Sequence, residues 1–196
     1  GDEREIFTME ELIEAFDIER INKSSAAFSL EKLTWLNGEH IRRLDPQKFH
    51  ELALKYYPEG VRHLDLEKIS RLIQIRIERF TEIPTMVKFL YELPDYDAAL
   101  FENPKSKSTL QSSREILQEV IPLLESMQEW TNESLFTALK DFAAAHGYKI
   151  GTAMWPIRTA LSGQFASPGG ATELADLLGK DETLRRLKIG LAKLQP

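Results

Sequence analysis

The chain has 196 residues, of which 42% are hydrophobic and none is cysteine, and its net charge is −6. This length can bury one sizeable core or two small ones, and the absence of cysteine excludes disulfides, thiolate catalysis and cysteine-bound zinc. No run approaches about eighteen apolar residues and the acidic start lacks a signal-peptide pattern, so we expect a soluble, cytoplasmic chain with no membrane partner. The charge argues mildly against a nucleic-acid partner, but residues 1–45 carry 11 acidic and 6 basic side chains, which leaves a basic face further along possible.

The first predicted helix opens with a capping box. Thr8 and Glu11 have the required spacing, and Leu12, Ile13 and Phe16 then fall on one face. We therefore expect an amphipathic helix close to the N-terminal end.

A longer helix is predicted from Asp65, because apolar residues recur at helical spacing as far as Phe80. At about 100° per residue from Ile69, Arg76 falls inside the apolar face and Arg79 on its border. An arginine inside an apolar face needs buried acceptors, which favours a structural role for Arg76. Arg79 is better placed to present its planar guanidinium to the edge of a base.

Residues 102–113 are polar, and we expect them to form a connector and hinge between two helical units. Within them, residues 105–109 superficially resemble an ATP-stabilising lysine loop. No nucleotide-binding strand and helix precede this segment, which favours a solvated hinge.

The second half of the chain predicts four more helices. The first runs through residues 116–124, where Pro122 is expected to introduce a kink. Thr131 or Asn132 caps the second helix, whose buried stripe includes Phe136.

The two remaining helices follow Gly147, which ends the second. Ser167 and Pro168 supply the cap and first residue of the third, and Asp181 opens the fourth. Alternating strand patterns are nearly absent, so the predicted fold is all-α. We expect three parts, which are residues 1–45, 46–105 and 106–196.

No catalytic or metal-binding constellation stands out. The four histidines are scattered and lack the spacing of H-E-x-x-H, and neither a glycine-rich phosphate loop nor a G-x-S-x-G turn occurs. We therefore expect no catalytic residue and no metal site in this chain.

A second positively charged feature combines an aromatic residue, an arginine and a glycine-containing turn. Trp155 and Arg158 precede residues 162–170, which lead to a helix N-terminus. Aromatic stacking, arginine and free backbone N–H groups are how proteins read splayed, single-stranded RNA bases. A core tryptophan followed by a turn and a capped helix fits the same pattern, and the residues alone leave both interpretations open.

Four segments then resemble one family, in the order in which that family carries them. They are EIFTMEELIEAFD (residues 5–17), FSLEKLTWLNG (28–38), PIRTALSG (156–163) and LGKDETLRRL (178–187). The first two resemble the part that follows the catalytic loop of bacterial-type glutamyl-tRNA synthetases, and the last two resemble the C-terminal signature of these class I aminoacyl-tRNA synthetases. The resemblance covers essentially the whole chain.

This resemblance implies that residues 1–45 end a stem-contact region and that the remainder forms a two-subdomain, helical anticodon-binding body. The full enzyme is a glutamate–tRNA ligase, whose separate Rossmann-type domain binds ATP and Mg through HIGH-like and KMSKS-like motifs. Neither motif occurs here. We therefore expect a non-catalytic C-terminal piece without cofactors, a monomer whose partner is tRNA(Glu) and not DNA.

The resemblance also assigns site residues. Arg79 and Phe80 match the position that reads the third anticodon base, where an arginine resembles the type that rejects glutamine tRNA. The matches to contacts with the first two bases are Trp155, Arg158, Ser167, Pro168 and Gly170. Trp155 stands where glutamine is common, so stacking would replace a hydrogen bond, and Gly170 stands where leucine is common, so a side-chain contact would be lost.

Two alternatives remain open at the level of sequence. The acidic net charge would also suit a helical protein-interaction module that never touches RNA. A synthetase paralogue that acts on a different tRNA would carry the same segments.

Overall fold

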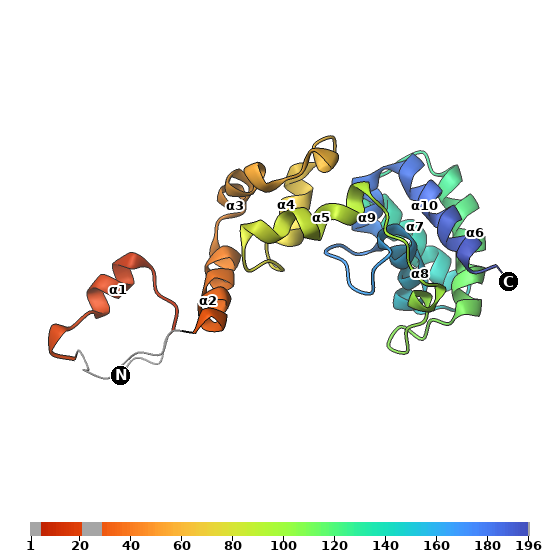
Figure 1. Cartoon of the computed structure of the whole chain (residues 1–196). Coiled ribbons are helices and arrows are strands. Elements are labelled where there is room, and N and C mark those ends of the chain that lie inside the picture. Colours follow the sequence, from red (N-terminus) through yellow and green to blue (C-terminus); the bar gives the residue numbers. More distant parts are fainter. Residues whose placement is uncertain (1–4, 21–28, 196) are drawn as a thin grey trace.

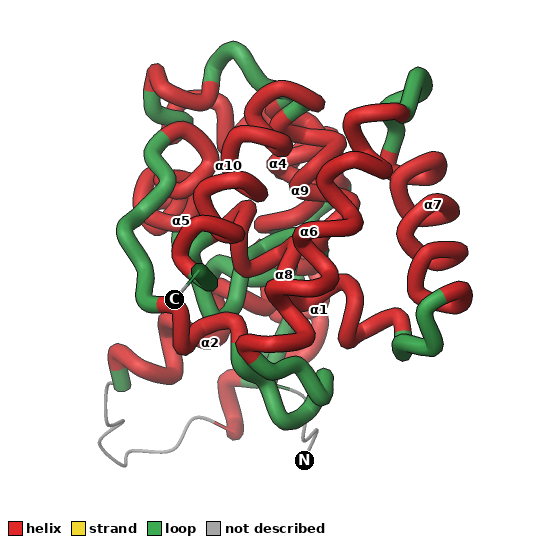
Figure 2. The backbone as a smooth tube through the Cα atoms, turned by 90° about the vertical axis from the view of Figure 1, so that its right-hand side faces the viewer, coloured by secondary structure: helices red, strands yellow, loops and turns green. Residues whose placement is uncertain are grey.

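The computed structural model describes residues 5–20 and 29–195 (Figure 1). Their regular structure is helical, apart from one isolated bridge between Asn103 and Ser108. The tube in Figure 2 accordingly shows helices and loops without a drawn strand. The all-α prediction is confirmed.

The α-helices of these described residues follow one another with short connections. They are α1 (Met9–Ala15), α2 (Leu30–Arg43), α3 (Pro46–Ala53), α4 (Leu66–Ile73), α5 (Ile83–Tyr91), α6 (Leu110–Ser126), α7 (Asn132–Ala145), α8 (Ile150–Ser162), α9 (Ala171–Leu178) and α10 (Lys180–Lys193). Five 3-10 turns lie between them, namely η1 (Ile18–Arg20), η2 (Leu54–Tyr56), η3 (Glu59–Val61), η4 (Phe80–Glu82) and η5 (Ala98–Phe101).

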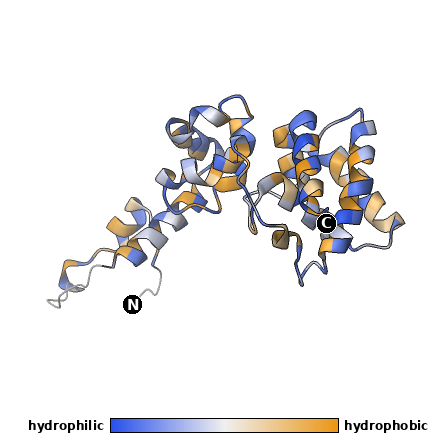
Figure 3. Ribbon diagram, turned by 45° about the vertical axis from the view of Figure 1, so that its right-hand side comes forward, coloured by the Kyte–Doolittle hydropathy of each residue, from blue (hydrophilic) through white to orange (hydrophobic). Residues whose placement is uncertain are grey.

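Helices α3 to α5 form one group and α6 to α10 another, and α1 lies apart from both (Figure 1). Helix α4 contacts both α3 and α5, whereas α6 to α10 pack on one another as a bundle. The turn η5 packs on α6 and α8 of that bundle. Each of these helices carries both hydrophobic and hydrophilic segments, as expected of helices that bury one face (Figure 3). The division of the chain at residues 45 and 105 stays a prediction.

Helix α1 begins as predicted. Thr8 caps it, with its hydroxyl accepting from the Glu11 amide while the Glu11 carboxylate accepts from the Thr8 amide. The predicted apolar face is nevertheless solvent-exposed, since Leu12, Ile13 and Phe16 retain 50, 69 and 66% of their accessible surface.

The long helix predicted from Asp65 to Phe80 is wrong at its far end. Helix α4 stops at Ile73, and the chain turns at Gln74, whose side-chain amide donates to the carbonyls of Ile41 (3.1 Å) and Leu44 (2.8 Å) at the end of α2. The Ile41 carbonyl also accepts from the Leu44 amide at 3.2 Å, so Gln74 adds a second bond to the local cap of α2. The apolar residues at helical spacing, such as Ile69, Ile73 and Ile77, are buried as predicted. They belong, however, to α4 and to the turn that follows it, and not to one long helix.

The region 102–113 is only partly a connector. Helix α6 already begins at Leu110, after a cap at Thr109. Before it, the Asn103 side chain accepts hydrogen bonds from the amides of Lys105 (2.9 Å) and Ser106 (3.3 Å), so this segment is a hydrogen-bonded turn. Its role as a hinge stays a prediction, as does a kink at Pro122, which lies inside α6.

The start of α9 differs from the prediction. The helix begins at Ala171 and not after Ser167, because Gly170 is its cap residue and donates its amide hydrogen to the Glu173 carboxylate at 2.8 Å. Ser167 instead donates its hydroxyl hydrogen to the Gly169 carbonyl. Residues 163–170 therefore form a loop between α8 and α9.

Candidate nucleic-acid interface

Trp155 and Arg158 lie one turn apart on α8 and stack on each other. The guanidinium carbon of Arg158 is 4.4 Å from the centre of the indole ring, a cation–π contact. The indole N–H donates to the Leu100 carbonyl at 3.0 Å, which fixes the ring plane. Phe165 completes the group with its ring edge-on to Trp155 at 5.4 Å, and it is 64% exposed.

The same arginine organises the loop of residues 163–170. Its two terminal nitrogens donate to the Ser167 hydroxyl (3.0 Å) and to the Phe165 carbonyl (2.7 Å). Burial lowers the pKa of Arg158, and the positive charge of Arg76 lowers this pKa further. Arginine nevertheless remains protonated, so the hydrogen bonds that its guanidinium donates to the loop are retained. Arg158 therefore shapes the loop before any ligand arrives.

Glycine is required where this loop begins. Gly163 ends α8 with a φ of +62°, a conformation that side chains rarely adopt. A Cβ atom there would also lie 2.8 Å from atoms of both Pro94 and Tyr96. The loop thus leaves α8 in close contact with the segment that follows α5.

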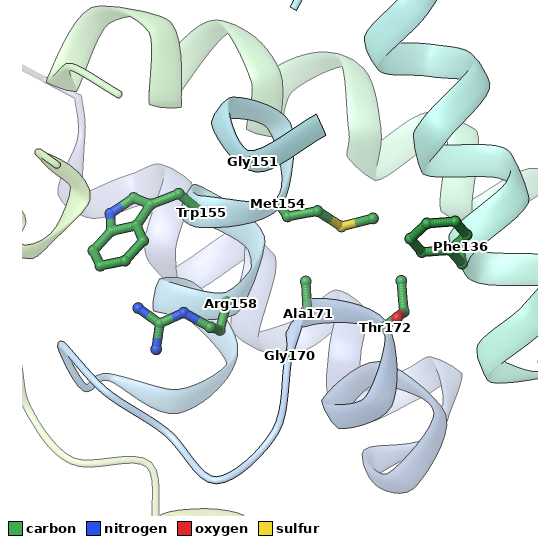
Figure 4. Close-up of a pocket in the computed structure, with 8 residues that line it drawn as sticks. All are labelled: Phe136, Gly151, Met154, Trp155, Arg158, Gly170, Ala171 and Thr172. Carbon is green, nitrogen blue, oxygen red and sulfur yellow. The ribbon is translucent and has the colours of Figure 1, made fainter. Parts of the chain in front are cut away.

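A pocket opens beside the Trp155–Arg158 pair (Figure 4). It has a volume of about 250 Å³ and is lined by Phe136, Gly151, Met154, Trp155, Arg158, Gly170, Ala171 and Thr172. Figure 4 shows the Met154 side chain extending from α8 toward Phe136 on α7. The prediction that Phe136 is buried is wrong, since it is 47% exposed. The sequence pattern assigned Phe136 to the buried face because it directly follows Leu135, which is buried.

Among the predicted contacts to the first two bases, Ser167 and Pro168 do not line this pocket, while Gly170 does. Ser167 is buried in the loop, where it links Arg158 to the Gly169 carbonyl. Pro168 is half-buried. The structure thus brings three of the five residues to one pocket and places the other two in its supporting loop.

Arg79 and Phe80 stand at the start of η4. Phe80 stacks on Phe49 and Tyr56, with ring centres 5.3 and 5.6 Å apart, so it anchors the backbone. The Arg79 side chain is 58% exposed, and its Nε donates to Glu82 at 3.1 Å. This exposed ion pair leaves the guanidinium largely accessible to a ligand.

The two regions meet where α4 approaches the loop. A Cβ atom on Gly169 would lie 3.3 Å from the Leu72 side chain, and Lys68 pairs with Asp176 at 2.7 Å. Arg76, predicted to be buried, is exposed. Its angular position no longer follows from α4, because that helix has ended at Ile73.

Over residues 5–20 and 29–195, no group of three or more histidine or acidic side chains could hold a metal ion. Within the same residues, no helix is long and apolar enough to cross a membrane.

Comparisons with known proteins place the chain. Residues 48–191 match the family model described as "Anticodon binding domain". The whole chain is 47% identical over 196 residues to a glutamate–tRNA ligase of Clostridium botulinum, and 97% of it is 44% identical over 194 residues to that of Clostridium acetobutylicum. In both comparisons it spans 40% of the relative's length.

Solved structures agree. A glutamate tRNA ligase from Elizabethkingia meningosepticum, in complex with its amino acid, superposes with a TM-score of 0.79 at 25% identity, covering 98% of this chain and 38% of that one. A glutamate–tRNA synthetase from Elizabethkingia anophelis, at 23% identity over 96% of this chain and 37% of that one, has the same fold with a TM-score of 0.73. The chain therefore belongs to the anticodon-binding domain family and corresponds to the part of glutamate–tRNA ligases that carries this domain.

Proposed function

We propose that this chain recognises the anticodon of tRNA(Glu) as part of a glutamate–tRNA ligase, and that it contributes binding and not chemistry. ATP, Mg and the reacting groups would belong to the remainder of such an enzyme, and the site of action would be the cytoplasm. The single observation that carries the proposal is the loop-anchored Trp155–Arg158 stack beside an open, largely apolar pocket.

One splayed base would enter the pocket. Met154 and Phe136 offer apolar surface to its ring, and base stacking on such surfaces tolerates any sequence. Identity would be read by donors at the pocket wall. Ala171 and Thr172 line it at the start of α9, where backbone N–H groups lack partners inside the helix and can donate to base carbonyl or ring nitrogen atoms.

Arg79 would read the third anticodon base. Its free terminal donors form a planar fork that suits two adjacent acceptors on one base edge. A contact of this kind discriminates by about 1–3 kcal/mol against the wrong base. Phe80 would serve this contact indirectly, since its stacking on Phe49 and Tyr56 fixes the backbone that presents Arg79.

Titration of the chain with a fluorescent anticodon stem-loop of tRNA(Glu), over a series of salt concentrations, tests the proposal. We expect binding that weakens steeply with salt, because each neutralised phosphate adds to the slope. A stem-loop with all three anticodon bases replaced is the matched control and should bind more weakly at every salt concentration. Equal binding of both RNAs would contradict anticodon recognition, and tighter binding of another tRNA's stem-loop would favour a paralogue. Absence of any RNA binding would favour the protein-interaction module.

A further inference from the structure

Arg186, on α10, is a buried cation, and each of its three side-chain nitrogens donates at least one hydrogen bond. The side chain is 1% exposed. One terminal nitrogen donates to the carbonyls of Phe89 (2.8 Å) and Leu161 (2.7 Å), and the other donates to the carbonyl of Leu90 (2.8 Å). Its Nε donates to the Glu182 carboxylate at 2.6 Å. Four of its five N–H groups therefore have acceptors, and a buried charge is tolerated only when it is paired and hydrogen-bonded in this way.

The three carbonyls belong to the last turns of two different helices. Phe89 and Leu90 lie at the end of α5, and Leu161 lies at the end of α8. Carbonyls in a last turn have no partner within their own helix, and the helix dipole attracts a cation to that end. One guanidinium therefore satisfies the ends of α5 and α8 together. A lysine could not reproduce this, because its ammonium is a single point and not a planar fork.

Each of these helices leads directly to a part of the candidate interface. Helix α5 follows η4 without a gap, and Arg79 immediately precedes η4. On α8, Leu161 lies one turn beyond Arg158, and the Ser162 hydroxyl donates to the Arg158 carbonyl at 2.8 Å. Arg186 therefore links the helix that follows Arg79 and η4 to the helix that carries Trp155 and Arg158.

Other polar contacts between the part of the chain up to residue 95 and the bundle of α6 to α10 restrain their relative position less. Lys68 and Asp176 form an ion pair whose lysine is 46% exposed, and Lys193 pairs with Asp95, which is 96% exposed. Exposed pairs contribute little and are screened by salt. The buried guanidinium is the contact that fixes both helix ends at once.

We infer that Arg186 is a positioning residue that sets the spacing between Arg79 and the Trp155–Arg158 pair, so that the two regions engage one anticodon together. The inference rests on the proposed function. It assigns a role to the LGKDETLRRL segment that involves no contact with RNA. Glu182 balances the charge, since it binds Arg186 and also the exposed Arg185.

The test is a set of double-variant titrations with the anticodon stem-loop of tRNA(Glu). Arg79→Gln is combined with Arg186→Met, with Arg186→Lys and with Arg185→Met. The last is the matched control, because Arg185 pairs with the same glutamate but its described bonds reach neither α5 nor α8. Circular dichroism checks the fold of each variant.

We expect Arg186→Met to weaken RNA binding about tenfold. In this background, Arg79→Gln should weaken binding by less than about a further twofold, because the two regions are no longer at the spacing that lets them bind one anticodon together. If Arg186 only supported folding, its replacement would lower the fraction of active protein equally in the presence and absence of Arg79. The ratio of the dissociation constants of the Arg79→Gln protein and the protein with Arg79 would then be the same as in the parent chain. Arg186→Lys should behave like Arg186→Met, and Arg185→Met like the parent chain.

The inference is overturned if a folded Arg186→Lys or Arg186→Met variant shows the parent affinity and the full Arg79→Gln loss. Loss of folding in Arg186→Lys would also overturn it, because the arginine would then be a requirement of folding and not of spacing. If the parent chain does not bind the RNA, the proposed function fails, which is a separate outcome.

Discussion

The guanidinium of Arg158 covers the ring of Trp155 at 4.4 Å, and the same group is bound by the loop that follows α8. A contact between Arg158 and a base would therefore depend on the stacking with Trp155 and on the hydrogen bonds to the loop. The resemblance to the family predicts contact with RNA at both residues, and the structure adds that the arginine also holds its own surroundings in place.

Replacement of Arg158 by methionine should weaken binding of the anticodon stem-loop about tenfold, because a charged hydrogen-bond donor to the loop is lost. Fluorescence anisotropy would measure this. Arg158→Lys keeps the charge but not the fork, so it should bind almost as weakly. Parent affinity in both variants would show that the loop needs no such support.

Gly170→Leu should close the pocket. Gly170 lines it together with Trp155 and brings no side chain into it. Gly170→Ala is the control, since its φ of −77° suits any residue and the added Cβ would meet only a Glu173 oxygen, at 3.3 Å. We expect a loss of RNA affinity with leucine and little change with alanine. Equal affinities would exclude the pocket as the base site.

Two glycines with positive φ provide a matched comparison of strain and crowding. Gly147 has a φ of +70° with open space around it, whereas Gly163 is crowded by Pro94 and Tyr96. Alanine should cost about 1 kcal/mol in the free energy of unfolding at Gly147, and about 2–3 kcal/mol at Gly163. Urea unfolding measures both. Equal losses of stability would mean that Pro94 and Tyr96 move away from the added Cβ atom at little cost.

The stability of the chain should depend on pH through Glu182. Hydrogen bonds from Arg185, and then from Arg186, lower the pKa of this carboxyl from 4.5 to about 2. A lowered pKa contributes stability that is present above pH 4.5 and is lost as the pH falls toward 2. Glu182→Gln should therefore be less stable than the parent at neutral pH, with a difference that narrows below pH 4.5. Thermal unfolding at several pH values would contradict this if the difference stayed constant.

Local signals in the sequence were sufficient for the helical fold and for several helix starts. Thr8 and Thr131 cap α1 and α7 as predicted, because capping involves residues only three positions apart. The end of α4 at Ile73 could not be predicted, since Gln74 there meets carbonyls at the end of α2, which lie 33 and 30 residues earlier in the sequence.

The same limit applies to the candidate site. Trp155 and Arg158 were identifiable from the combination of an aromatic residue, an arginine and a glycine-containing turn, and from the family resemblance. The burial of Arg186 was not, because its carbonyl partners on α5 lie 96 and 97 residues away in sequence. The exposure of Arg76 was missed because a helical wheel assumes that the helix continues.

The most direct test of anticodon recognition compares two stem-loops that differ only in the third anticodon base, one from tRNA(Glu) and one with the base of a glutamine anticodon. The parent chain should prefer the glutamate stem-loop by about 5- to 150-fold, which corresponds to about 1–3 kcal/mol. Arg79→Gln should abolish this preference and leave the helical circular dichroism unchanged. Equal binding of both RNAs by the parent chain, or a preference that survives Arg79→Gln, would contradict the account.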